Sequence, residues 1–301
     1  RGGDRAVQQT MIAASILLSG MILGGIYAMV ALGLTLQYGV ARIMNLAYGE
    51  FLVAAAFGAW WLFTANAVSP LAGLVVIVPV AFLLNWLIYH LLLMPLVRRA
   101  KSRDALEADS ILFTFGLLFV VQGILLSTFG GQLYSYSYLL VPVDLLGTTV
   151  SANRLIALLF ALVIGLGLYL ALTRTRAGTA VRAVAVDPRS ARLVGIDVPR
   201  VSALAFALGG ALCAAAGVLV SMFLTFSAGG GVLFTMKALI VVIMGGVGSL
   251  LGTLVAGLVL GLSEVAVARL VDPGLTLAVN FVIFLGVLLV RPTGLFGSSA
   301  R

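Results

Sequence analysis

One short segment of an otherwise apolar chain carries side chains that could bind a solute or an ion. The segment reads ARIMNLAYGEF and contains Asn45, Gly49 and Glu50. An amide and a carboxylate are costly at membrane depth, so they are candidates for a transport pathway. Gly49 weakens a helix by about 1 kcal/mol relative to alanine and permits irregular backbone, which membranes tolerate where it lines a cavity or is buried by protein. The alternative is an interfacial loop whose charges are solvated.

A second glycine-rich segment, much later in the chain, echoes the first. Each segment contains an Ile-Met pair, Ile43-Met44 and Ile243-Met244, and each is followed by a helix rich in small residues. Glycine-interrupted apolar segments in the two halves of a chain are typical of paired repeats that form a pathway at the membrane midplane. We therefore expect an internal repeat, and a translocation pathway lined by both segments. The expected pathway residues are Asn45, Gly49, Glu50, Gly245, Gly246 and Gly248.

The other reactive side chains form no catalytic or metal-binding pattern. The chain has one His and one Cys, so we expect no catalytic residue and no metal site. The phosphate-binding pattern G-x-x-x-x-G-K-[ST] is absent, because the only two lysines, Lys101 and Lys237, follow Ala100 and Met236. Lys237 and Glu264 are expected near the ends of membrane spans, where long side chains reach water. The chain is therefore not expected to hydrolyse a nucleotide.

Composition excludes a soluble fold around these segments. Of 301 residues, 62% are hydrophobic, and 18 basic and 10 acidic residues make up only 9% of the chain, against about 25% in soluble domains. The mean hydropathy is +1.20. We expect an all-α integral membrane protein, because an unpaired strand cannot satisfy its backbone in lipid.

A single transmembrane domain over residues 1–301 is expected, with about eight helices and a range of six to ten, some of them broken or re-entrant. The seventh apolar segment contains the second glycine cluster, so a half-helix followed by a full crossing is expected there. The apolar segments lie at about residues 10–36, 51–66, 70–94, 109–128, 154–172, 201–225, 236–268 and 275–291.

Small residues recur at i, i+4 in several of these segments, as in Gly20 with Gly24 and Gly257 with Gly261. In lipid, such pairs let two helix backbones approach closely. We interpret them as packing within the subunit. A subunit interface is the alternative.

Basic residues gather in two short loops, which contain ten of the 18. Such loops resist translocation and mark the cytoplasmic side. The 25 residues from Phe129 to Asn153 contain no lysine or arginine and are expected on the opposite side. The net charge of +8 follows from this topology, so no nucleic-acid partner is expected. The ten basic residues are Arg98, Arg99, Lys101, Arg103, Arg174, Arg176, Arg182, Arg189, Arg192 and Arg200.

The second basic loop, residues 173–200, contains a helix signal. Asp187 can cap a helix, Pro188 suits its first position and Gly195 suits the position beyond its end, which predicts a helix of about two turns. Such a helix has two roles open to it: lying on anionic lipid or docking to a cytoplasmic partner. Its surface would present Arg189, Arg192, Leu193 and Val194.

Four stretches of the chain occur in an order that matches a known family. They are GIYAMVALGLTLQYGVARIMNLAYGEF, RAVAVDPRSARLVGIDV, IMGGVGSLLGTLVAGLVLGLSE and RPTGLFG. Together, over about residues 20–297, they resemble the permease subunit of branched-chain amino acid ABC importers, LivH type. The resemblance implies a multi-pass protein of the bacterial inner (plasma) membrane, in contact with lipid. It also implies a second permease subunit of LivM type, two cytoplasmic ATPase subunits and a periplasmic amino-acid-binding protein.

The resemblance implies that ATP and Mg²⁺ bind to the ATPase subunits and that this chain holds no cofactor. It makes the loop 173–200 the cytoplasmic coupling loop, and it places MNLAYGEF beside the pathway. Tyr48 departs from the family pattern, in which His is frequent. The residues implied in ATPase coupling are Arg182, Ala183, Asp187, Arg189, Arg192, Leu193, Val194 and Gly195.

Two functions follow from these patterns. The first is the permease subunit of an ATP-driven importer for branched-chain (aliphatic) amino acids. The alternative is an ion-coupled secondary transporter or channel for small amino acids, amides or urea. It would use Glu50 or Glu264 as its coupling site and would work without partners.

Overall fold

The computed structural model describes residues 2–100, 102–145 and 148–297, which are mainly helical. In these ranges, seven helices are long and apolar enough to cross a membrane. The expected all-α multi-pass fold is confirmed, and each predicted apolar segment is helical. The long helices are α1 (Gly2–Ala41), α2 (Tyr48–Asn66), α3 (Pro70–Ile88), α5 (Arg103–Phe129), α6 (Ala152–Arg174), α9 (Val198–Ser221), α10 (Gly231–Gly245), α11 (Leu250–Leu270) and α12 (Thr276–Val290).

Shorter elements connect these helices. A π-helical turn continues α3 into α4, two helices fill the loop between α6 and α9, and a hairpin of two antiparallel strands precedes α6. The short elements are η1 (Tyr89–Leu93), α4 (Met94–Arg99), β1 (Pro142–Leu145), β2 (Thr148–Ser151), α7 (Arg176–Val186), α8 (Pro188–Leu193) and η2 (Pro273–Leu275).

The seventh apolar segment is divided in two, as its glycines predicted. α10 ends at Gly245, and the backbone then turns through Gly246 and Gly248, whose φ angles are +99° and +83°. Glycine adopts such angles without a steric cost. α11 begins after Ser249, whose hydroxyl accepts a hydrogen bond from the backbone N–H of Gly252 at 3.1 Å. With 15 residues, α10 is shorter than the roughly 20 residues of a full crossing.

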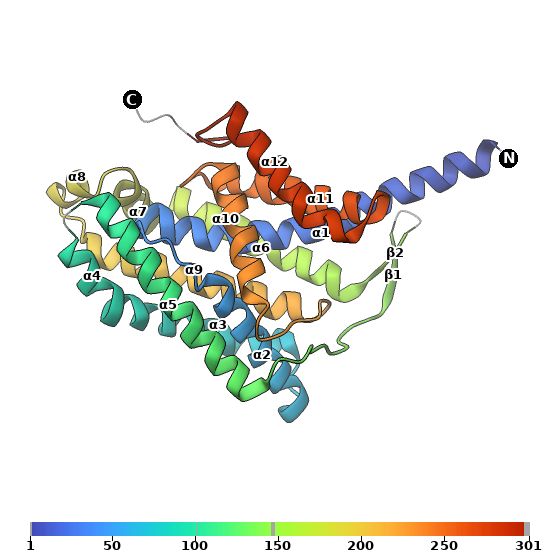
Figure 1. Ribbon diagram of the computed structural model, residues 1–301, viewed down its shortest axis with the longest axis horizontal. Helices are drawn as coiled ribbons and strands as arrows, with labels where there is room; N and C mark the ends of the chain where they lie inside the picture. Colours follow the sequence, from blue (N-terminus) through green and yellow to red (C-terminus); the bar gives the residue numbers. More distant parts are fainter. Residues whose placement is uncertain (1, 101, 146–147, 298–301) are drawn as a thin grey trace.

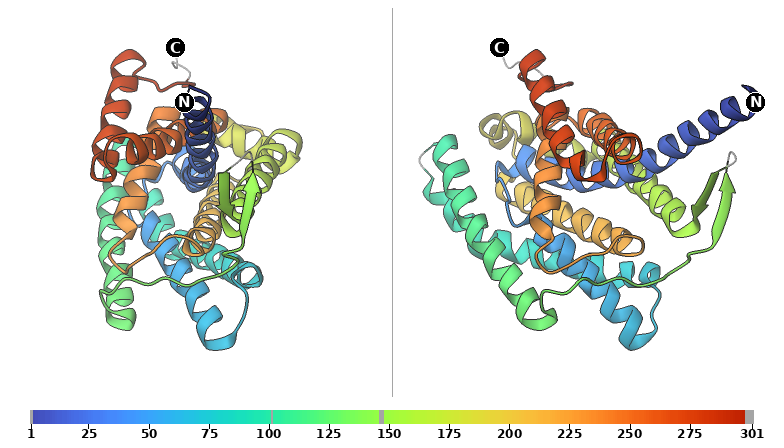
Figure 2. Two further views of the ribbon diagram at one scale, coloured as in Figure 1. Left: turned by 90° about the vertical axis from the view of Figure 1, so that its right-hand side faces the viewer. Right: turned by 45° about the vertical axis from the view of Figure 1, so that its right-hand side comes forward.

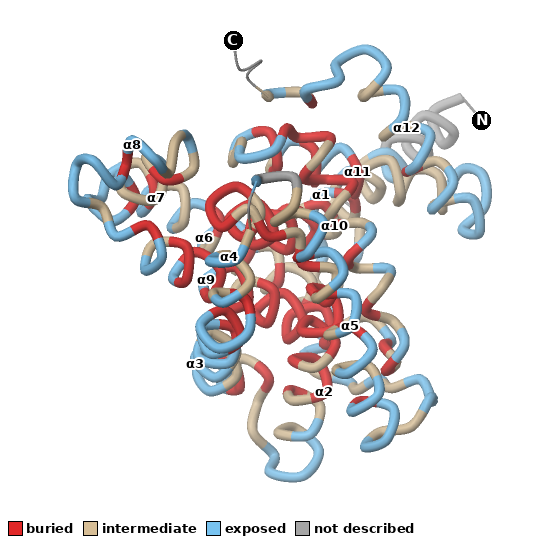
Figure 3. Tube along the Cα trace, turned by 60° about the vertical axis from the view of Figure 1, so that its left-hand side comes forward, coloured by how far each residue is buried: buried red, intermediate tan, exposed pale blue. Residues whose placement is uncertain are grey.

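The core of the molecule is formed by α1, α2 and α9. Figure 3 shows buried residues concentrated in these helices, with exposed residues along α3, α5 and α12. The exposed residues of the outer helices are largely apolar, such as Leu112 at 74% and Leu289 at 86% exposure. Apolar surface of this extent suits contact with lipid tails.

The small-residue pairs pack helices within the subunit, which confirms that interpretation. Gly24 on α1 faces Gly257 and Gly261 on α11, and a Cβ added at Gly24 would lie 2.8 Å from the Cα of Leu258. Gly257 is in turn pressed against Ala28. The two backbones approach so closely that no side chain fits between them.

The two kinds of loop lie at opposite ends of the molecule. Figure 1 shows α4, α7 and α8 together at one end and the β1–β2 hairpin at the other. Both views in Figure 2 show the extended segment between α5 and β1 crossing the molecule. It is held by paired backbone hydrogen bonds between Tyr134 and Phe226, at 2.8 and 3.0 Å. Among the basic residues of the first loop, Lys101 and the side chain of Arg103 lie outside the described part of the chain.

Replacing Gly24 by leucine should destabilise the fold, because the side chain would force α1 away from α11. Overpacking of this kind costs about 1–3 kcal/mol. A lower midpoint of thermal unfolding in detergent is the expected result. Gly123→Leu on α5 is the matched control, because no atom lies within 4 Å of its added Cβ. Equal midpoints for the two variants would contradict the close α1–α11 contact.

Candidate functional site

α1 and α2 are separated by nonhelical backbone, residues 42–47, that lies inside the protein. Tyr48, the first residue of α2, is fully buried, and its hydroxyl donates to the carbonyl of Val30 at 2.8 Å. Val30 lies about 16 Å along α1 from its end at Ala41, so α2 begins within the depth that α1 spans. The expected irregular backbone is present, but it precedes Gly49, which lies in the first turn of α2.

A chain of side-chain amides fixes this break to α1 and α9. The Asn45 amide nitrogen donates to the side-chain oxygen of Gln37 at 3.0 Å, and Gln37 donates to the carbonyl of Phe206 at 2.9 Å. The Asn45 side-chain oxygen accepts from the N–H of Ala47 at 3.1 Å. Asn45 is fully buried, so in this structure its amide stabilises the break.

Two hydroxyls of α5 form hydrogen bonds with further backbone groups of the break. Ser110 accepts from the N–H of Met44 at 3.3 Å, and Thr114 accepts from the N–H of Leu46 at 3.1 Å. Thr114 also donates to the carbonyl of Met44 at 2.9 Å. Sequence reasoning missed both hydroxyls, because a lone Ser or Thr in an apolar helix carries no signal of a distant backbone partner.

Gly49 and Glu50 contact the N-terminal end of α10. The N–H of Gly49 donates to the hydroxyl of Thr235 at 2.8 Å, and a side chain at Gly49 would collide with the carbonyl of Gly231. The Glu50 carboxyl group packs on Gly231, is fully buried, and has no hydrogen-bond partner on either oxygen among the described residues. The positive end of the α10 dipole is the favourable neighbour of this carboxyl group.

The second glycine cluster packs against the chain segment that follows α12. The N–H of Leu295 donates to the carbonyl of Met244 at 2.8 Å, and the N–H of Phe296 donates to that of Gly245 at 3.1 Å. A Cβ at Gly246 would lie 2.6 Å from the backbone nitrogen of Gly297. These contacts satisfy carbonyls at the C-terminal end of α10.

The six predicted pathway residues thus form two clusters. Gly49 and Glu50 contact the N-terminal end of α10, and the three glycines lie at its other end, about 21 Å away along the helix. Asn45 is bonded to Gln37 on α1, two residues before Gly39, which lies against Gly248. The short, partly buried helix α10 therefore connects the two groups. The internal repeat stays a prediction.

Lys237 and Glu264 form a partly buried ion pair, so the expectation that they reach water separately is wrong. The Lys237 Nζ lies 2.8 Å from Oε1 of Glu264, and the two side chains are 18% and 15% exposed. The Tyr27 hydroxyl and the Asn280 amide donate to Oε2 of Glu264, at 3.0 and 3.1 Å. A charge inside a membrane is retained when it is paired and hydrogen-bonded. This cluster joins α1, α10, α11 and α12.

The helix predicted after Asp187 is confirmed as α8. The Asp187 carboxylate accepts from the N–H of Arg189 at 2.9 Å and from the hydroxyl of Ser190 at 2.6 Å. Pro188 occupies the first position, and Gly195 follows the helix with φ at +83°. A second helix in the loop, α7, was not expected from the sequence.

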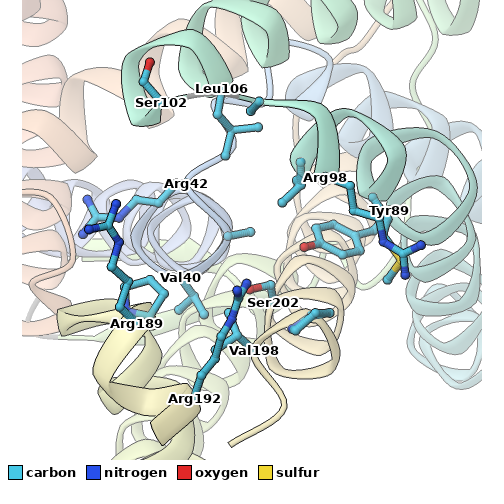
Figure 4. A pocket seen from close by; sticks show the side chains of 16 residues that line it. Val40, Arg42, Tyr89, Arg98, Ser102, Leu106, Arg189, Arg192, Val198 and Ser202 are labelled. Carbon is cyan, nitrogen blue, oxygen red and sulfur yellow. The ribbon is translucent and has the colours of Figure 1, made fainter.

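The two sides of the second basic loop, residues 173–200, differ in exposure. Leu193 and Val194 are 88% and 76% exposed, whereas Ala191 and Val184 are buried against Val40 at the end of α1. Of the other predicted coupling residues, Arg182 is exposed and Ala183 is partly buried, both on α7. Arg189 and Arg192 line a pocket beside α1 (Figure 4).

Arg42 ties the coupling loop to the break. Its backbone has a left-handed φ of +58°, and its Nη2 atom donates to the carbonyl of Ala185 on α7 at 3.0 Å. The first residue of the break is therefore bonded to the basic loop, residues 173–200. Sequence reasoning did not assign this role, because the two residues are 143 positions apart.

Comparison with known proteins agrees with this architecture. The family described as branched-chain amino acid transport system / permease component matches residues 16–290. The high-affinity branched-chain amino acid permease protein LivH of Escherichia coli K12 is 28% identical over 300 residues, covering 93% of this chain and 94% of LivH. BraD of Pseudomonas aeruginosa is 28% identical over 290 residues, with the same coverage.

A probable LivH permease of Methanocaldococcus jannaschii is 26% identical over 292 residues, covering 94% of this chain and 92% of the relative. No solved structure matches the chain. The family match and the relatives each cover nearly the whole chain, and its membrane-capable helices suit a multi-pass inner-membrane protein. This chain therefore belongs to the branched-chain amino acid transport permease family.

Proposed function

We propose that this chain is the LivH-type permease subunit of an ATP-driven importer for branched-chain amino acids. It forms the translocation pathway with a second permease subunit of LivM type. Two cytoplasmic ATPase subunits bind ATP and Mg²⁺, and a periplasmic binding protein delivers the substrate. The relatives named above, which are permeases of branched-chain amino acid transport systems, support this proposal.

The observation that carries the proposal is the exposed apolar pair at the end of α8. Leu193 and Val194 project from a helix whose other side is anchored on α1. Large exposed apolar residues beside arginines are typical of a protein interface. An importer subunit without a nucleotide site must bind an ATPase subunit. A groove on that subunit would therefore receive the exposed apolar pair.

Movement of the ATPase subunits reaches the membrane through a short series of contacts. α8 packs on α7 and on the end of α1, and α7 holds Arg42 through the carbonyl of Ala185. Arg42 begins the break, which in turn contacts the N-terminal half of α10 through Thr235. A rigid-body shift of α7 and α8 would therefore displace the backbone beside Glu50 and open the pathway to the other side.

Glu50 favours the alternative, an ion-coupled transporter, because a buried carboxyl group without a hydrogen-bond partner can bind a proton or a cation. The two functions differ in whether the chain can transport a solute without partner subunits. Purified alone in liposomes, the chain should show neither ATP hydrolysis nor uptake, and addition of the partner subunits should restore ATP-dependent uptake of leucine. Uptake driven by a proton or sodium gradient, by the chain alone, would overturn the proposal.

The double variant Leu193→Asp, Val194→Asp should insert normally but lose ATPase association and transport together. An interface anchor is worth about 2 kcal/mol or more, so the affinity should fall by a factor of about 30 or greater. Copurification of the ATPase subunits measures this loss. The variant Arg189→Ala, Arg192→Ala should be milder and more sensitive to salt, since exposed ion pairs are worth under about 1 kcal/mol.

The control for this experiment is Leu133→Asp, Val141→Asp in the loop at the opposite end, where the exposed fractions are 76% and 58%. This variant should keep the ATPase subunits. If the α8 variant also copurifies with them and transports normally, α8 is a membrane-surface element. Coupling would then be sought first in residues 98–109.

Gly246→Leu should reduce transport even in complexes that assemble, because the turn at the end of α10 needs a positive φ and has no room for a side chain. The assay is uptake normalised to the amount of assembled complex. Gly286→Leu on α12 is the control, because no atom lies within 4 Å of its added Cβ. Unchanged uptake by assembled Gly246→Leu complexes would remove the second cluster from the pathway.

A further inference from the structure

A pocket of about 510 Å³ lies at the end of the molecule that carries the basic loops. The residues that line it come from the end of α1, η1, α4, the start of α5, α8 and the start of α9. In Figure 4 the guanidinium groups of Arg42 and Arg189 lie on one side of the pocket, and Arg98 lies beside Tyr89 on the other. The pocket therefore lies between the two basic loops. The charge pattern assigns this end to the cytoplasm.

Four arginines line the pocket, and the lining residues include no aspartate or glutamate among those described. Of the acids close to it in sequence, Asp187 caps α8 and Asp197 pairs with Arg200 at 2.8 Å. A pocket lined by several arginines and by no described carboxylate attracts an anion. The four arginines are Arg42, Arg98, Arg189 and Arg192.

The guanidinium groups retain free donors. The Nη2 atom of Arg42 is bonded to Ala185, but its Nε is buried and has no hydrogen-bond partner in the described part of the chain. The side chains of Arg98, Arg189 and Arg192 form no hydrogen bond or ion pair with any residue that the structure describes. The unsatisfied Nε of Arg42 is costly because it is buried. The other three arginines are exposed, and a phosphate oxygen is a strong charge-assisted acceptor for a guanidinium group.

The rest of the lining is apolar, with Val40, Val97 and Leu106 between the arginines. One turn before the pocket, Leu91 and Leu92 on η1 are 58% and 45% exposed on the outer surface. The pocket thus adjoins the surface that meets lipid tails. Arginines above an apolar wall suit an amphiphile with an anionic head better than a free inorganic ion.

We propose that this pocket binds the phosphate group of an anionic phospholipid from the cytoplasmic leaflet. Basic pockets between membrane helices on this side bind the head groups of such lipids. The phosphate would accept hydrogen bonds from both basic loops, since Arg98 belongs to the first and Arg189 and Arg192 to the second. Lipid would then hold α8 against α4. This assignment depends on the orientation of the chain and is independent of what it transports.

The test uses the full chain, purified in detergent with its copurifying subunits and placed in nanodiscs. Dioleoyl phosphatidylglycerol is titrated into a phosphatidylcholine background, and retained lipid is counted by native mass spectrometry. The native protein should retain phosphatidylglycerol, and Arg98→Gln, Arg192→Gln should weaken its binding by about tenfold or more. Retention should also fall as salt is raised.

The matched control is Arg99→Gln, Arg176→Gln, which removes two exposed arginines that do not line the pocket. It should leave lipid retention unchanged. Equal retention by the pocket variant and the control would overturn the proposal, as would displacement of the lipid by millimolar inorganic phosphate with no preference for the lipid. If the pocket variant keeps its lipid but loses the ATPase subunits, the pocket is a protein-docking site and the lipid assignment is wrong.

Discussion

Backbone inside a membrane must find hydrogen-bond partners within the protein, and the break between α1 and α2 depends on this requirement. Asn45 from the break itself and Ser110 and Thr114 from α5 supply those partners. Because the break is satisfied by side chains, α2 can begin beside the middle of α1. That placement brings Glu50 to the N-terminal end of α10, which is the central contact of the candidate pathway.

The same break is joined to the basic loop, residues 173–200. The hydrogen bond from Arg42 to Ala185 links the end of α1 to α7 in that loop. A helix kept in place only by lipid could move without affecting the core. Here Ala191 of α8 packs in one apolar cluster with Val184 of α7 and Val40 at the end of α1, so side-chain contacts hold α8 to the membrane helices.

Close packing also holds the membrane helices rigidly to one another. α1 meets α11 through glycines that leave no space between the backbones, and the Lys237–Glu264 pair crosslinks four helices inside the membrane region. Removing one partner of a buried ion pair leaves an uncompensated charge, which is far more costly than losing both. Because Lys237 on α10 is bonded to Tyr27 on α1 and to Glu264 on α11, these contacts hold α10 to both helices.

The sequence by itself determined the features that depend on local chemistry. Composition required a helical membrane protein, the glycines at 245–248 predicted the division of the seventh segment, and Asp187, Pro188 and Gly195 predicted α8, because caps and turns use residues close together in the chain. Only the tertiary structure decided the rest. It placed Gly49 and Glu50 at one end of α10 and the glycine cluster at the other, paired Lys237 with Glu264, and gathered four arginines around one pocket. Such contacts join residues far apart in sequence, and no local pattern records which of them become neighbours.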